Sequence, residues 1–457
     1  MQKFLFSVLC VGILAGCEKT EQSDFAAPVE QELENATIFP DGVPVRLSYA
    51  EAVGVAEQGI RMLEDGVSTR ATGRTIDDSQ VKAFVPVVTR SGEADTLMYV
   101  FNFADSAGFA IVSSFRETEQ LLAVTESGSY TPGEPTGNPA LDWYLSSLEE
   151  EISAYAARGG NGTNGMTLPE PPGPPGTYPT KIERAEYTST TGPLVPVAWG
   201  QDCSPYNSEL LINKNLPIGE KYPAGCVATA IAQIMSVYAY PTSIVLTYDG
   251  TNKNKTLDWA NMLCFYNNNR HTGVIQIETT DNIGFLMAEI GKRVNMSYEK
   301  NNKNKKVAKA SNNNVPTGFT SFGYHISALK SYSSSSVRSE VAQGRPVYMS
   351  GTDTSHTLDD DDVGHAWVID GYKTVTRVTT TYWAETSDGP WFPESRETQT
   401  FYYNHCNWGW EEAGNGYFSE NQFSVGDKYE YDNPSEPGTP YRFSSDLKMF
   451  TDIYPGY

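Results

Sequence analysis

Cys226 has the residue type and the local setting that thiol chemistry requires. It opens a segment whose apolar residues recur at the three- and four-residue spacing of a buried helix, and Pro241 ends that pattern. The first turn of a helix offers unpaired N–H groups and the positive end of the helix dipole, which stabilise a thiolate and an oxyanion. The sequence therefore predicts Cys226 as a nucleophile, with ordinary core packing as the alternative.

A nucleophilic thiol needs a base, and His365 is the candidate among five histidines. It follows a glycine at the start of a β-rich run, where a strand can hold it rigidly beside a cleft. His405 alternates with Cys406, so the two should lie on opposite faces of a strand. Three others stand among polar residues and are interpreted as surface groups: His271, His325 and His356.

Asn407 and Trp408 follow closely after His405. Asn407 could orient the imidazole of His365, and Trp408 could shield the Cys226–His365 pair from water, with ordinary packing as the alternative for the tryptophan. The order Cys, His, Asn is typical of partners that meet in space and not in sequence.

The segment that precedes these candidate catalytic residues predicts a domain without a nucleophile or a base. Residues 36–157 predict a small α+β domain that contains no histidine and no cysteine. Ser48 and Glu51 are spaced as a capping box that opens an apolar helix, and residues 98–114 are typical of a β-hairpin. Pro139 begins a second helix. We expect this domain to be regulatory or structural.

A segment rich in Gly, Asn and Pro, residues 158–190, separates the two halves of the chain and predicts an exposed activation linker. Lys181 and Arg184 are candidate cleavage points. Residues 191–457 hold every histidine and should carry the chemistry. For the remaining cysteines of this half, one disulfide or reduced burial is equally compatible: Cys203, Cys264 and Cys406.

The first residues of the chain predict export. Residues 1–16 have a lysine followed by an apolar run that is too short to span a bilayer, which is typical of a signal peptide. The stretch that ends at Cys17 resembles a bacterial lipobox, so we expect Cys17 to be acylated and residues 17–35 to be a polar tether. An ordinary signal peptide is the alternative. The protein would be a bacterial membrane or cell-surface lipoprotein, and release of the mature part remains open.

Composition excludes one class of partner. The formal charge of −23 comes from 33 basic and 56 acidic residues and repels phosphate backbones, so nucleic acid is not expected. The acidic run 359–362 precedes His365 and is interpreted as a solvated loop rather than a calcium site or a subsite for basic residues.

With these residues in place, the second half resembles the streptopain family of papain-like cysteine proteases. The resemblance is carried by residues 199–207, 225–230, 364–371 and 407–410, with smaller echoes at 258–262 and 345–348. The first half is similar to the propeptide of that family at residues 99–102 and 108–113.

The resemblance implies an α+β fold in which the Cys226 helix packs on an antiparallel sheet carrying His365 and Asn407, behind a small α+β inhibitory prodomain. It further implies that Gln201 donates to the oxyanion, that Cys226 and His365 form a thiolate–imidazolium pair, and that Asn407 with Trp408 supports the histidine. No metal or organic cofactor is needed.

The expected function is that of a cysteine endopeptidase made as a zymogen, which hydrolyses protein or peptide substrates through a thioester and is inhibited by its own prodomain. Two departures from the family pattern leave substrate preference open: the stretch 411–414 and the long segment between Tyr372 and Phe401. Two rivals remain, a papain-fold acyl-transfer enzyme such as a cell-wall amidase or transglutaminase, and a non-catalytic surface binding protein.

Overall fold

The computed structural model describes these residues: 31–32, 46–64, 73–84, 96–116, 119–157, 180–201, 222–248, 251–268, 277–300, 304, 306–352, 364–384, 390–420, 423 and 447–456. The predictions for the signal peptide, for Cys17, for Cys203 and for the acidic run 359–362 lie outside the described residues, as does the side chain of Cys264. None of the described helices combines the length and the hydrophobicity that a membrane-spanning helix requires.

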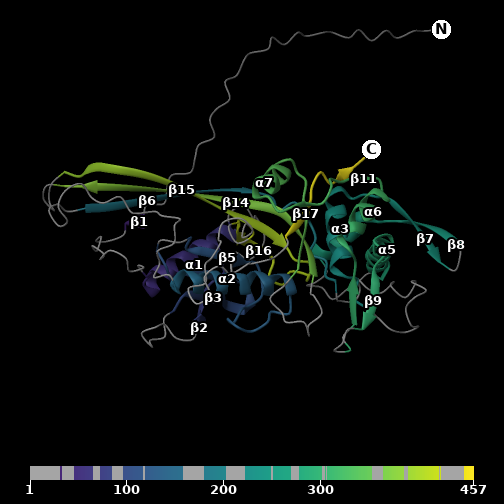
Figure 1. Ribbon diagram of the computed structural model, residues 1–457, viewed down its shortest axis with the longest axis horizontal. Helices are drawn as coiled ribbons and strands as arrows, with labels where there is room; N and C mark the ends of the chain where they lie inside the picture. The colour runs from purple at the N-terminus through teal and green to yellow at the C-terminus, as the bar shows by residue number, and fades with distance from the viewer. Residues whose placement is uncertain are drawn as a thin grey trace, which may run out of the picture.

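One twelve-stranded antiparallel sheet runs through the molecule (Figure 1). Its strands are, in spatial order, β12 (Lys330–Ser331), β17 (Lys448–Phe450), β13 (Val347–Thr352), β14 (Gly364–Trp383), β15 (Phe392–Asn407), β16 (Gly416–Ser419), β5 (Leu121–Thr125), β4 (Phe109–Ser113), β3 (Met98–Phe103) and β2 (Ile76–Phe84). Off this path, β6 (Thr180–Thr191) pairs with β14 and β1 (Gln31–Glu32) pairs with β6.

The prodomain supplies one end of this sheet. Its last strand, β5, pairs with β16, and Val124 stands opposite Tyr417. Its helices α1 (Tyr49–Glu64) and α2 (Pro139–Ala157) begin where the sequence predicted. The predicted capping box is confirmed, because the Ser48 N–H donates to the Glu51 carboxylate at 2.7 Å and the Glu51 N–H donates to Ser48 Oγ at 3.3 Å.

The described helices of the second half are α3 (Cys226–Tyr238), α4 (Trp259–Asn268), α5 (Ile277–Arg293), α6 (Val315–Thr320) and α7 (Ser334–Ala342). Of these, α3, α5 and α6 gather at one end of the molecule, whereas α7 lies near its middle, against β13 and β14 (Figure 1). Three two-stranded sheets accompany them: β7 (Ser243–Tyr248) with β8 (Thr251–Thr256), β9 (Ser297–Lys300) with β10 (Lys306–Lys309), and β11 (Tyr324–His325) with β18 (Tyr454–Pro455). The predicted helix from Cys226 packs on β13 and β14, which confirms the expected helix-on-sheet arrangement.

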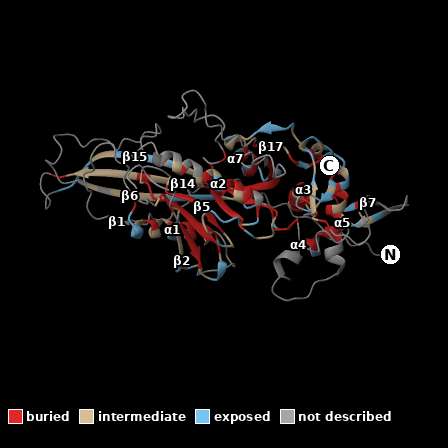
Figure 2. Cartoon of the chain, turned by 60° about the horizontal axis from the view of Figure 1, so that its bottom comes forward, coloured by how far each residue is buried: buried red, intermediate tan, exposed pale blue. Residues whose placement is uncertain are grey.

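The outer parts of β14 and β15 form a long arm with β6 on the other side of β14 (Figure 1). Most of this arm is only half-buried, whereas the bases of the strands are buried (Figure 2). The structure thus places residues 180–190, which the sequence assigned to the linker, in a strand. Lys181 and Arg184 stand there opposite Tyr382 and Thr379. A protease needs an unpaired, extended backbone, so cleavage at either residue requires β6 to separate first.

The two faces of the central strands pack against different partners. Ala366 and Val368 point into the hydrophobic core around α3, and we call this side the α3 face. Trp367 and Ile369 alternate with them and share a core with α2 and α7, and we call that side the α2 face. A strand alternates its side chains with period two, so neighbouring residues of β14 belong to different environments.

Candidate active site

The nucleophile candidate occupies the position that the sequence predicted. Cys226 is the first residue of α3 and is half-buried against the core of the α3 face. Gly225 before it has φ 92°, and a Cβ built there would lie 2.6 Å from Met296 Sδ. Only glycine meets both conditions, so this turn delivers the thiol to the N-terminal end of the helix, where unpaired N–H groups and the dipole favour a thiolate.

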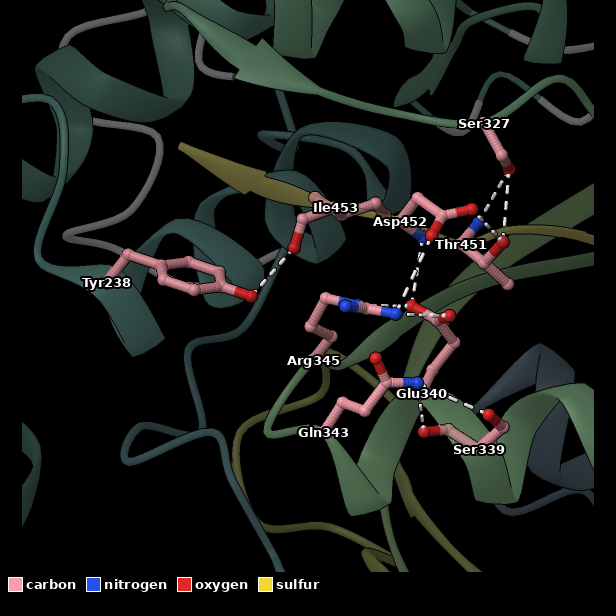
Figure 3. Close-up of polar contacts among 9 residues, drawn as sticks. All are labelled: Tyr238, Ser327, Ser339, Glu340, Gln343, Arg345, Thr451, Asp452 and Ile453. Atoms are coloured by element: carbon pink, nitrogen blue, oxygen red, sulfur yellow. Dashed lines mark hydrogen bonds and ion pairs between the residues drawn. The ribbon is translucent and has the colours of Figure 1, made fainter. Parts of the chain in front are cut away.

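The other end of α3 is held by the C-terminal segment of the chain (Figure 3). The Tyr238 hydroxyl donates to the Ile453 carbonyl at 2.7 Å. The next residue back, Asp452, donates its N–H to Glu340 at 3.0 Å, and Glu340 binds Arg345 through both carboxylate oxygens. The bidentate, partly buried pair of Glu340 and Arg345 fixes the position of this segment, so the C-terminal end of α3 is held in place.

The base candidate lies on the α2 face. His365 is 6% exposed, and its imidazole lies between the Trp367 and Trp410 indoles, each 6.4 Å away between ring centroids. Its Nε2 lies 2.9 Å from the Trp408 carbonyl oxygen and therefore donates to it. That bond places the proton on Nε2 and leaves Nδ1 as the basic nitrogen.

Burial lowers the pKa of His365 to about 4, and the bond to the Trp408 carbonyl offsets only part of that shift. A neutral carbonyl cannot replace the hydration that a charged imidazolium loses. The histidine is therefore neutral near pH 7 in this state. The thiolate–imidazolium pair that the resemblance implied stays a prediction; in this structure the imidazole contacts the Trp408 carbonyl and two indoles, and Cys226 is packed against the core of the α3 face.

Asn407 does not orient His365, and here the expectation was wrong. Its Nδ2 donates to the Val197 carbonyl at 2.9 Å, and its Oδ1 accepts from Gln233 Nε2 at 2.9 Å. Val368 stands opposite Asn407 in the ladder, so the amide points to the α3 face and binds the nucleophile helix instead. Its role is to tie the end of β15 to α3.

Trp408 supports the histidine through its backbone, not only its ring. The ring is buried 5.3 Å from the Trp367 ring, and its Nε1 donates to the Gly414 carbonyl at 3.0 Å. Its carbonyl is the acceptor for His365. A backbone carbonyl has no residue-type signature, which is why sequence reasoning assigned this part to the adjacent amide.

Gln201 is buried between the two halves of the site. Its N–H donates to the Gly409 carbonyl at 3.0 Å, and its carbonyl accepts from the Ala224 N–H at 2.6 Å. These bonds connect the turn after Trp408 with the turn before Cys226. Donation from the Gln201 side chain to an oxyanion stays a prediction.

The prodomain packs beside His365 and donates hydrogen bonds to the loop that follows Trp408. The Trp143 ring of α2 lies 6.3 Å from Trp367, the indole against which His365 stacks. The N–H of Glu126 donates to the Asn415 carbonyl at 2.7 Å, and Ser127 Oγ donates to the Glu412 carbonyl. Inhibitory domain and histidine therefore share one packed layer.

Sequence reasoning missed a second polar group on the α3 face. His405 is 3% exposed, and its Nδ1 lies 2.6 Å from Asp370 Oδ1. The sequence predicted that His405 and Cys406 point to different faces of their strand. This is confirmed, because Cys406 is buried in the core of the α2 face. No local pattern indicated Asp370, since its partner lies on the next strand.

Comparisons with known proteins find similarity in both halves of the chain. Residues 199–418 match the Peptidase C10 family, and residues 44–152 match the Spi protease inhibitor family. Streptopain of Streptococcus pyogenes is 24% identical over 396 residues, which cover 79% of this chain and 82% of that protein. The thiol protease/hemagglutinin PrtT of Porphyromonas gingivalis is 25% identical over 373 residues, or 77% of this chain and 37% of that relative.

Among solved structures, the prointerpain A fragment of Prevotella intermedia is 22% identical, with a TM-score of 0.47 over 82% of this chain and 98% of the fragment. The active interpain A protease of the same organism is also 22% identical, with a TM-score of 0.36 over 58% of this chain and 95% of that chain.

Proposed function

We propose that this chain, a cysteine peptidase with a Peptidase C10 domain behind a Spi-inhibitor-like domain, is the zymogen of an endopeptidase. The observation that carries the proposal is the stack from the prodomain indole Trp143 through Trp367 to His365. It ties the inhibitory domain to a catalytic base that is buried and neutral.

In the proposed reaction the base works through its free nitrogen. His365 Nδ1 takes the proton of Cys226. The Nε2–H group stays hydrogen-bonded to the Trp408 carbonyl, and this bond holds the ring in its tautomer. The thiolate attacks the peptide carbonyl, and the Cys226 N–H and Gln201 stabilise the oxyanion. His365 then protonates the leaving amine, and water hydrolyses the thioester.

Removal of the prodomain is the proposed activating step. It uncovers the α2 face at Trp367 and frees the loop that Glu126 and Ser127 hold. Water then reaches the imidazole, the pKa of His365 rises from about 4 toward its ordinary value, and the ion pair with Cys226 becomes accessible.

We extend the proposal to export and anchoring. The apolar run and Leu-Ala-Gly before Cys17 support a lipoprotein that is carried out of the cytoplasm and held at a membrane through that cysteine. Incorporation of radioactive palmitate into the full chain, and its loss in Cys17→Ser, would test the anchor independently of any protease activity.

The activity is tested by following the size of the soluble precursor, begun after Cys17, with and without Cys226→Ala. We expect the unmutated chain to convert to a fragment that starts between about residues 159 and 195 and then to hydrolyse a denatured protein. The variant should stay intact and become cut when active enzyme is added.

Equal processing of both chains would show that a separate protease activates this one. Release of amine from peptidoglycan fragments, or incorporation of an amine into glutamine side chains, without hydrolysis of denatured protein would favour an acyl-transfer enzyme instead. Failure of a thiol-directed epoxide to label Cys226 in the processed chain would favour a non-catalytic binding protein.

A further inference from the structure

Strands β14 and β15 change register at a single residue. Ile369 stands opposite Cys406 and Gly371 stands opposite His405, so Asp370 is one extra residue in β14. Such a bulge bends a strand and redirects the side chains beyond it. His365 lies five residues before this bulge, near the start of β14, so its direction depends on the bulge.

The side chain of the bulged residue is fixed by two buried contacts. Asp370 Oδ1 lies 2.6 Å from His405 Nδ1, and Oδ2 accepts the N–H of Val195 at 2.8 Å. Asp370 is 0% exposed and His405 3%. A buried, hydrogen-bonded ion pair is costly to separate, so the bulge is pinned at this place.

The prodomain adds a third group. Nε2 of His405 lies 3.4 Å from Oε1 of Glu126, which directly follows β5. This is an ion-pair distance, and Glu126 is the half-exposed member. The ring of Tyr417, from β16, crosses His405 edge to face at 5.0 Å, and Lys373, from β14, places its Nζ 4.7 Å from the same ring.

Register at the bulge decides whether base and acceptor meet. Val368 stands opposite Asn407, the residue before the Trp408 carbonyl, and a slip of one residue would exchange the two faces of the strand. The Nε2 of His365 would then lose the carbonyl that fixes its tautomer. Pinning the bulge therefore acts on the base from five residues away.

We propose that Asp370 and His405 are positioning residues of the active site, which hold the bulge that aims His365 at the Trp408 carbonyl, and that Glu126 couples this pair to the prodomain. The inference rests on the proposed function of Cys226 and His365. It adds a buried pair that does not touch the substrate and a route by which prodomain departure reaches the catalytic strands.

The charge state of the pair supports this assignment. Burial alone would lower the pKa of His405, but Asp370 first and Glu126 second outweigh it and raise the pKa to about 10. His405 is therefore protonated across the neutral range. Loss of Glu126 with the prodomain removes one of the two carboxylates that face this imidazolium.

The experiment measures the rate at which iodoacetamide alkylates Cys226 as a function of pH, together with kcat and KM on a peptide, in activated protein. The variants are Asp370→Asn and His405→Gln. We expect kcat to fall about ten- to a hundred-fold with KM within about threefold, and the pH profile of alkylation to move by about one pH unit.

Glu289→Gln is the matched control, because Glu289 is a buried carboxylate of the same domain whose ion pairs, to Arg293 and Lys292, lie within α5 and do not involve the bulge. It should lower thermal stability and leave the alkylation profile in place. If Asp370→Asn and His405→Gln behave like this control, the pair is only structural and the proposal is overturned. Alkylation needs no peptide hydrolysis, so this outcome differs from a failure of the proposed function.

Glu126→Gln in the full-length precursor tests the coupling and remains informative if the buried variants fail to fold. We expect its conversion to the processed fragment to be several-fold faster than that of the unmutated chain, while the processed enzymes are identical in kcat and alkylation profile. Equal conversion rates would overturn the role given to Glu126. Glu134→Gln, another carboxylate of the prodomain that is exposed, is the control.

Discussion

Two buried histidines on neighbouring strands have opposite pKa shifts. His365, on the α2 face, has its pKa lowered to about 4 because burial is opposed only by a neutral carbonyl. His405, on the α3 face, has its pKa raised to about 10 because two carboxylates outweigh an equally complete burial. Burial alone therefore does not decide whether a histidine is charged, because the neighbouring carbonyl or carboxylates determine the direction of the pKa shift. One is suited to take a proton, the other to hold position.

The prodomain contributes to both environments. Its helix α2 covers the face with the neutral histidine, and Glu126 supplies one of the two carboxylates of the charged histidine. Prodomain departure should therefore bring the two pKa values closer together.

The largest expected effect comes from exchanging the base for an amide. His365→Gln should reduce kcat/KM on a peptide about 10⁴-fold, because no group remains to take the Cys226 proton. His405→Gln should retain more than 1% of the activity, by our estimate of a roughly ten- to hundred-fold loss for a positioning residue. Both are measured on chains processed by added active enzyme. Similar losses of kcat/KM in the two variants would contradict the assignment of His365 as the base and His405 as a positioning residue.

A smaller effect is expected from the packing of α2. Trp143→Ala removes an indole that is buried against Trp367 and should cost about 3–5 kcal/mol of precursor stability. In a Cys226→Ala background, urea unfolding measures this loss, and in the active chain conversion should be faster. Trp391→Ala, at an exposed position on the arm, is the control. An unchanged conversion rate in Trp143→Ala would show that the packing of α2 does not keep the precursor inactive.

The smallest effect is a pair of opposite pH dependences. Between about pH 6.5 and 4 the unfolded chain binds the proton that buried His365 refuses, so stability falls as pH falls through this window. Between about pH 6.5 and 10 folded His405 keeps a proton that the unfolded chain releases, so stability falls as pH rises. Within its window, each histidine should change the free energy of unfolding by at most about 1.4 kcal/mol per pH unit.

Urea midpoints of the Cys226→Ala precursor from pH 4 to 10 measure both. His365→Gln should flatten the acid arm alone, and His405→Gln the alkaline arm alone. A variant that flattens the arm assigned to the other histidine would contradict the assignment of the two windows.

Much of the local structure could be predicted because its signals are local. Apolar spacing and Pro241 defined α3, and the capping box of Ser48 and Glu51 defined the start of α1. The hairpin of β3 and β4 and the placement of Cys226 at a helix start followed in the same way. The strand β6 was not anticipated, because its polar, threonine-rich sequence follows directly on the Pro/Gly-rich segment and pairs with a distant strand.

The sequence by itself determined which residues could do chemistry and which helix carries the thiol, because residue type and short-range periodicity are written in consecutive positions. Only the tertiary structure decided that the Trp408 carbonyl, and not Asn407, accepts the hydrogen bond from His365 Nε2, and that Asp370 forms a bulge pinned by His405. It also decided that prodomain and protease share one sheet. These features depend on strand register, which sets the face of every side chain and arises from pairing between segments far apart in the chain.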